Sequence, residues 1–388
     1  PQRNRTILSF ILYMLWNKNF SLLIAANILL FIGVYMLFPL FFQWMVKEWG
    51  CTVSQASILV ALFAPAMFIP GAFNNYLVDT FSRKQVCIRS VIMLAAIGLI
   101  SQYVSQQWMA VGLWMLQGVF FSLALMATGS TLVIDVTPSS KRNAANRVFT
   151  WTSILSTIFG LLIGLNGPSM LPISKLLYLS SALCGCSAFL ITMVQVCFRA
   201  PLDLPLCSFD RFILFRTLLP GLNMLCVPIV LGMVLSAMPD ALFYLSIVGG
   251  FIVYLLLRQL SSISQNGKLQ VFLGQVLTLA GLVVLLVVDS GVHLHASGFL
   301  IGLGTGFSIG HFLHMMILLP MHCERGTSYQ TFQLLWQLGF VAALAVAVSG
   351  SVFSTSREVY EGAILVCIAG LLFYQLYTCR YFKEHYQQ

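Results

Sequence analysis

The stretch Asn75–Lys84 reads NYLVDTFSRK and separates two long apolar runs, Ser54–Phe73 and Val86–Val104. Each run contains about 20 residues, which is enough for a helix to cross the hydrocarbon core of a bilayer. The stretch between them is short and carries one carboxylate, Asp79, together with two cations. Charges gathered in a short turn between apolar runs are typical of a membrane protein with several spans.

The composition of the whole chain indicates the same class. The 388 residues are 59% hydrophobic and only 8% charged, with a mean hydropathy of +0.92. Soluble domains contain about 25% charged residues, so this chain lacks the polar surface of a soluble enzyme. Backbone polar groups inside a bilayer must bond to one another, and runs of this length satisfy that condition as helices. The sequence therefore predicts an all-α integral membrane protein.

Twelve apolar runs, each bounded by charged or turn residues, predict twelve transmembrane helices. All the connections between them are short. The predicted spans are Phe20–Met45, Ser54–Phe73, Val86–Val104, Trp108–Ile134, Phe149–Leu165, Leu176–Cys197, Phe212–Ala237, Ala241–Leu257, Leu269–Val288, Val292–Leu319, Thr327–Val348 and Glu361–Tyr377.

The cations are distributed unequally between the two ends of these spans. Of the 20 Lys and Arg residues, only Lys47, Lys175 and Arg357 fall on one side, and all the others fall on the opposite side. The positive-inside rule places the cation-rich side, and both termini, in the cytoplasm. The N-glycosylation sequon Asn19–Ser21 lies on that side, and with the short loops it favours a bacterial-type inner membrane. The net charge of +9 is thus explained by topology, and no nucleic-acid partner is predicted.

A short internal repeat suggests duplication. Arg142 precedes Phe149 by the same interval as Arg325 precedes Phe332, and the two copies are about half a chain apart. We therefore expect two pseudo-symmetric six-helix bundles. Their predicted bounds are residues 1–198 and 212–388, joined by a cytoplasmic connector at residues 199–211.

The stretch quoted at the outset resembles the cytoplasmic signature loop of the major facilitator superfamily, whose pattern is G-x-L-a-D-x-x-G-R-[RK]. The matching residues are Leu77, Asp79, Arg83 and Lys84. Asn75 and Ser82 replace the two glycines, and Asn is the residue other than glycine that best tolerates a left-handed backbone. We call residues 75–84 the signature loop. The resemblance implies a twelve-span fold that works by alternating access.

Further residues carry the resemblance less fully. Gln117-Gly118 matches the fourth span of the family, but Trp114 stands where many members have arginine. Gly160 and Gly164 resemble part of a motif found in drug exporters. The pattern around Phe38-Pro39 is similar to the drug and sugar efflux branch, which implies efflux.

The resemblance also implies a role for the charges at the cytoplasmic ends of the spans. A carboxylate held near the positive end of a helix in the other half would stabilise one of two rocking states. The residues predicted for this gating latch are Asp79, Arg83, Lys84, Arg142 and Arg325. The alternative is that these cations serve only the positive-inside rule.

Polar side chains at membrane depth recur in the spans that line the central cavity of this family. On the eleventh span Gln330, Gln333, Trp336 and Gln337 share one helical face. A stripe of amides facing lipid would be unfavourable, so we expect it to face protein or a wet cavity. The predicted solute-binding residues are Asn27, Gln117, Asn223, His311, His314, Gln333, Trp336 and Gln337. The alternative for each is a hydrogen bond that only holds helices together.

Together these patterns predict a secondary active transporter and not an enzyme. No paired carboxylates, nucleophile motif or nucleotide-binding loop occurs, and no cofactor or metal is expected. Because no carboxylate lies in the middle of a span, a small neutral or amphipathic solute fits better than a strong cation. The expected partners are that solute, the lipid bilayer and, as the candidate coupling ion, the proton. The alternatives are a nutrient uptake permease of the same fold and a transport-inactive membrane scaffold or sensor.

Overall fold

The computed structural model describes residues 16–196, 205–260, 266–287, 291–321 and 323–386. Within these ranges the secondary structure is helical throughout, with no strand. Of the predicted connector, residues 199–204 fall outside the described residues and 205–211 are described. The all-α prediction is therefore confirmed.

Twelve helical segments of the described chain are long and apolar enough to cross a membrane, which confirms the predicted number. They are Lys18–Trp49, Val53–Thr80, Arg83–Tyr103, Gln107–Val136, Ser139–Met170, Ile173–Met193, Phe215–Ala237, Ala241–Arg258, Gly267–Val287, Val292–Leu318, Arg325–Val348 and Ser356–Tyr386. The fifth and the last segments extend well beyond their predicted ends. Hydropathy marks only the part of a helix that matches the hydrocarbon core, whereas the backbone hydrogen bonds continue into polar sequence.

Within these segments the structure has individual helices with the following bounds. They are α2 Lys18–Tyr35, α3 Leu37–Trp49, α4 Val53–Ala61, α5 Phe63–Ala66, α6 Asn74–Thr80, α7 Arg83–Ile100, α8 Gln107–Leu125, α9 Val133–Val136, α10 Arg142–Met170, α11 Ile173–Met193, α12 Leu218–Met224, α13 Cys226–Ala237, α14 Ala241–Leu260, α15 Gly267–Val287, α16 Val292–Leu318, α17 Arg325–Val348, α18 Ser356–Phe373 and α19 Cys379–Tyr386.

Prolines explain where several spans are interrupted. Three single-residue breaks each lie three positions before a proline. The pairs are Met36 with Pro39, Leu62 with Pro65, and Leu225 with Pro228. Proline lacks an N–H donor and its ring crowds the carbonyl of the preceding turn, so the helix loosens there.

Two spans also contain wider turns of π-helix, at Met126–Leu132 and Tyr374–Thr378. In the first, the hydroxyls of Ser130 and Thr131 donate to the backbone carbonyls of Met126 and Ala127. Such back-bonding gives the backbone of a buried helix a local alternative to its regular pattern. Turns of this kind are frequent at functional sites, and the first one leads directly into α9.

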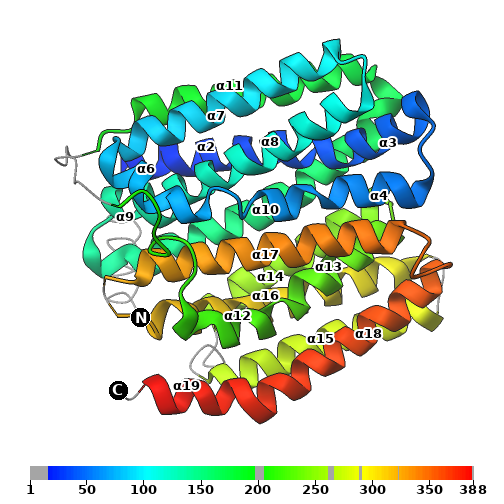
Figure 1. The fold of residues 1–388 in the computed structure, drawn as a ribbon. Coiled ribbons are helices and arrows are strands. Elements are labelled where there is room, and N and C mark those ends of the chain that lie inside the picture. The colour runs from blue at the N-terminus through cyan, green and yellow to red at the C-terminus, as the bar shows by residue number, and fades with distance from the viewer. Residues whose placement is uncertain (1–15, 197–204, 261–265, 288–290, 322, 387–388) are drawn as a thin grey trace. The chain divides into compact units, whose positions relative to one another are not determined.

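The chain forms two compact units. Unit 1 comprises the described parts of Pro1–Leu40 and Ala66–Ile213, and unit 2 those of Phe41–Pro65 and Leu214–Gln388. In unit 1, α2 packs against α10 and α11, and α7 packs against α8 and α11. In unit 2, α16 lies between α14 and α15, and α17 packs against α13 and α4. Figure 1 shows α15 and α18 side by side.

Glycine allows the closest of these approaches. A Cβ atom added at Gly302 of α16 would lie 2.0 Å from the carbonyl oxygen of Ile247 on α14. One added at Gly304 would lie 2.4 Å from the carbonyl oxygen of Gly274 on α15. Small residues are what permit this proximity between helices in a membrane.

Candidate functional site

The signature loop is mostly helical in the structure. Asn75 belongs to α6, the chain turns at Phe81 and Ser82, and α7 begins at Arg83. Ser82 has φ −63° and ψ 125°, a conformation open to any residue. The two positions where the family pattern has glycine therefore require no left-handed backbone here, contrary to the reason we considered for Asn75.

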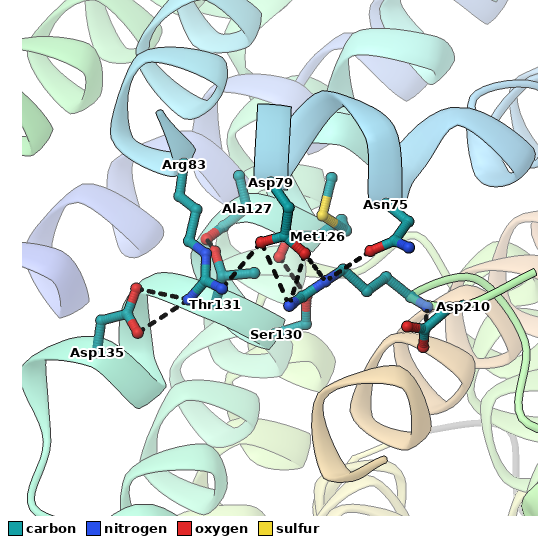
Figure 2. A network of polar contacts seen from close by, with 10 residues as sticks. Asn75, Asp79, Arg83, Met126, Ala127, Ser130, Thr131, Asp135 and Asp210 are labelled. Carbon is teal, nitrogen blue, oxygen red and sulfur yellow. Dashed lines mark hydrogen bonds and ion pairs between the residues drawn. The ribbon is translucent and has the colours of Figure 1, made fainter. Parts of the chain in front are cut away.

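A network of ion pairs surrounds the predicted latch residue Asp79 (Figure 2). Arg83 Nη2 lies 3.0 Å from Asp79 Oδ1, and Arg83 Nη1 lies 3.0 Å from both carboxylate oxygens of Asp135. Asp135 is in α9, immediately after the π-helical turn. The side chains of Arg83 and Asp135 are only 12% and 10% exposed. Buried charges of this kind are tolerated when each is paired and hydrogen-bonded.

A second arginine enters the network from the far end of the connector. Arg211 Nη2 lies 3.1 Å from Asp79 Oδ2, and Arg211 Nε donates to the Oδ1 atom of Asn75 at 3.2 Å. With Arg83 and Asp135, the four charged groups sum to zero. Asp135 and Arg211 were not among the residues predicted for the latch. The sequence did carry a signal for them, since Asp135 directly follows the fourth predicted span and Arg211 directly precedes the seventh.

The remaining latch residues have other surroundings. Lys84 Nζ donates to the carbonyl oxygen of Thr192, 2.8 Å away. Arg142 and Arg325 are each the first residue of a helix, α10 and α17, as the predicted repeat implies. Both are half-buried, and the Nε atom of each lacks a hydrogen-bond partner.

In unit 1, Asn27 joins two helices. Its Nδ2 atom on α2 donates to Ser153 Oγ on α10 at 2.9 Å, and more weakly to the Phe149 carbonyl at 3.4 Å. The side chain is 1% exposed, yet its Oδ1 atom accepts no hydrogen bond. The Nδ2 atom of Asn27 therefore links the two helices, while its buried Oδ1 atom stays without a donor.

Gln117 lies on a face of α8 between two aromatic residues of the same face, Trp114 and Phe121. Its Oε1 atom is buried and accepts no hydrogen bond. Trp114 packs edge-on against Phe38, with ring centroids 4.8 Å apart, and Phe121 packs against Tyr35 at 6.0 Å. Trp114, in the position where many relatives carry arginine, thus completes an aromatic cluster beside an unpaired amide.

In unit 2, aromatic rings and buried glutamine amides also occur together, along α17. The rings of Tyr329, Phe332, Trp336 and Phe340 stack successively, with centroids 6.2 to 6.5 Å apart. Gln333 Nε2 donates to the hydroxyl of Tyr329 at 2.8 Å. Gln330 is fully buried, and neither its oxygen nor its nitrogen has a hydrogen-bond partner. Gln337 is fully buried on the same helix.

The other predicted solute residues of unit 2 have partners on other helices. The amide of Asn223 on α12 hydrogen-bonds Thr378 Oγ1 at 2.8 Å, which joins α12 to the π-helical turn of the last span. His311 is 7% exposed and packs edge-on against Tyr374, with centroids 6.0 Å apart. Its ring also covers Gly267 at the start of α15. His314 is exposed, with its ring 6.2 Å from that of His311.

Two surface cavities of unit 2 involve none of the predicted solute residues. One, of about 370 Å³, lies among α13, α15, α16 and α18, with Arg357 and Tyr360 in its wall. The other, of about 470 Å³, is an apolar groove lined by residues of α15 and of the last span, Lys268 and Phe272 among them. The residues that line these two cavities include none from α17.

The fold defines a multi-pass helical membrane protein, with twelve segments of the described chain long and apolar enough to cross a bilayer. The sequence pattern of the Major Facilitator Superfamily matches residues 23–344, and the chain belongs to that family. No curated protein sequence matches the chain. Among solved structures, a crystal structure of a mutant of the nucleoside transporter NupG is similar to it, with a TM-score of 0.65 and 14% sequence identity. The match covers 93% of this chain and all of the other, and it establishes the shared fold.

Proposed function

We propose that this protein is a secondary transporter for a small, neutral solute with a planar, polar ring, and that it works by alternating access in the inner membrane. The observation that carries this proposal is the occurrence of packed aromatic rings beside buried amides that have at least one polar atom without a hydrogen-bond partner. It occurs independently in each unit, at Gln117 beside Trp114 and at Gln330 beside the ladder of α17.

The two kinds of group have complementary roles toward such a solute. Aromatic side chains stack on a planar ring, which contributes about 1–3 kcal/mol per base in single-strand nucleic-acid complexes. A carboxamide offers an acceptor and two donors to the edge of that ring. Buried amides left unpaired also penalise a solute that has no polar edge, so they supply selectivity. We propose a neutral solute because no carboxylate lies in the middle of any predicted span to pair with a cation.

Separate observations favour each of the two directions of transport, efflux and uptake. Phe38-Pro39 and its neighbours resemble exporters, which supports efflux. The structural similarity to a nucleoside transporter supports uptake and gives the first solutes to test, uridine and adenosine. Protons remain the candidate coupling ion, and the charge network at the signature loop supplies the latch.

The test uses the full chain purified in detergent and then placed in proteoliposomes. Uridine and adenosine should raise the melting temperature, because a ligand that binds only the folded state stabilises it. Ribose, which lacks the planar ring, is the matched control. Flux of labelled uridine, with and without a proton gradient of either sign, then gives direction and coupling. If no solute moves under any gradient, the protein is a scaffold or sensor and the proposal is wrong.

A further inference from the structure

The described end of the connector is fastened to unit 1. The backbone N–H of Ser208 donates to the carbonyl oxygen of Ala72 at 2.8 Å. The side-chain Nδ2 of Asn74 donates to the carbonyl oxygen of Arg211 at 3.2 Å. These two bonds hold both sides of a short turn against the start of α6. The described part of the connector is therefore held by unit 1 at Ser208 and again at Arg211.

An aromatic contact completes this attachment. The ring of Phe212 lies over Gly71, where an added Cβ atom would come within 2.2 Å of it. The same ring packs edge-on against Phe68, with centroids 6.1 Å apart. Glycine at position 71 thus leaves the space that Phe212 occupies, and the connector is held by packing as well as by hydrogen bonds.

The backbone of Arg211 shows that these contacts fix its position. Its φ is +57°, and it is the one residue other than glycine in the described chain with a positive φ. This left-handed conformation is unfavourable for a residue with a Cβ atom and persists only where surrounding contacts impose it. It directs the guanidinium at Asn75 and Asp79, 136 and 132 positions earlier.

Unit 2 holds the chain almost immediately afterwards. The backbone N–H of Leu214 donates to Thr331 Oγ1 on α17, 2.9 Å away. Only Ile213 separates Leu214, which is bonded to unit 2, from Phe212, which is the last residue shown packing against unit 1. One residue of free chain spans at most about 3.6 Å. Any movement of one unit relative to the other must therefore twist the backbone at Phe212–Leu214, break the hydrogen bond from Leu214 to Thr331, or release the connector from unit 1.

We propose that Asn75, Asp79 and Arg211 form a connector clasp, which is closed in one state of the transport cycle and opens in another. This inference rests on the proposed transport function. Arg211 is a positioning residue that acts through Asp79: while it is docked, it occupies the Oδ2 atom of the latch carboxylate, and its withdrawal frees that oxygen. The clasp also gives a physical reason for Asn75 in place of the family's glycine, since its Oδ1 accepts from Arg211.

The first test measures amide hydrogen exchange across residues 205–213 in the full chain. Arg211→Gln should accelerate exchange of the Ser208 amide about tenfold, because the charged hydrogen bonds that hold the turn are lost. Arg211→Lys should give an intermediate rate, since lysine keeps the charge but lacks the planar fork.

Asn75→Gly should accelerate exchange less than Arg211→Gln, and the two changes should not add, because they remove one shared contact. Arg216→Gln, a change to a nearby exposed cation, should leave the rate unchanged. Unchanged exchange in Arg211→Gln overturns the clasp.

The second test separates a role in the cycle from a role in stability. In proteoliposomes, Arg211→Gln should change the maximal flux of uridine severalfold while the uridine concentration for half-maximal flux stays the same, and Arg211→Lys should partly restore the flux. A variant with faster exchange but unaltered flux would show that the clasp only holds the connector. If the unaltered protein moves no solute, the proposed function fails, and the exchange measurements still decide whether the clasp exists.

Discussion

Arg83 Nη1 lies 3.0 Å from both carboxylate oxygens of Asp135, although the two residues are 52 positions apart. Because the same guanidinium also bonds Asp79, Arg83 ties the end of the second span and the start of the third to the C-terminal end of the fourth. The signature loop is therefore a structural junction of unit 1 as well as a candidate latch.

Removing Arg83 should destabilise the protein. Arg83→Gln leaves the largely buried carboxylate of Asp135 without this cationic partner, and breaking a fully buried ion pair costs about 3–5 kcal/mol, which is the upper bound here. Thermal unfolding in detergent should show a clear fall in melting temperature. Arg357→Gln removes an exposed pair with Glu361 and should have little effect, because such pairs contribute little. Equal melting temperatures for the two variants would contradict the junction.

Removing the charge of Asp79 should slow transport. Asp79→Asn keeps the shape of the side chain but cannot attract Arg83 and Arg211, so the latch loses its carboxylate. We expect flux in proteoliposomes to fall about tenfold or more per folded protein, while expression persists. Lys175→Gln, an exposed cation on the opposite side, is the control. Flux that matches the unaltered protein would reject the latch role of Asp79.

Substitution of two glutamines one turn apart on α17 should change the free energy of unfolding in opposite directions. Gln330→Met removes a buried amide with no hydrogen-bond partner and should raise the free energy of unfolding by about 1 kcal/mol, while uridine binding falls. Gln333→Met breaks the bond to the hydroxyl of Tyr329 and should lower the free energy of unfolding. Thermal unfolding with and without uridine measures both effects. A loss of stability in Gln330→Met would show that its amide is satisfied in the protein.

Adjacent glycines of α14 offer a test of helix packing. An added Cβ atom at Gly250 would lie 2.0 Å from the carbonyl oxygen of Phe299, whereas at Gly249 nothing lies within 4 Å. Gly250→Ala should therefore destabilise unit 2 by about 1–3 kcal/mol. Gly249→Ala should be neutral or slightly stabilising, because alanine favours a helix. The melting temperatures of the two variants decide the question, and the reverse order would contradict the packing of α14 on α16.

The residues of the candidate site show which features follow from the pattern within one span and which do not. The face of α17 that bears Gln330, Gln333 and Trp336 follows from spacing alone, and the structure shows all three side chains buried there. The surroundings of His311 could not be predicted in the same way. Its ring meets Gly267 and Tyr374, which come from two other spans, and no pattern within one span identifies such neighbours.

What the sequence by itself determined is the class, the number of spans and the position of the signature loop. Hydropathy, charge and helical spacing are properties of neighbouring residues, and in a bilayer they leave few alternatives. The tertiary structure alone decided which partners the buried groups have: Arg211 and Arg83 for Asp79, Ser153 for Asn27, and none for Gln330. These pairings depend on which spans pack together, at which height and rotation, and that is set by contacts between residues far apart in the chain.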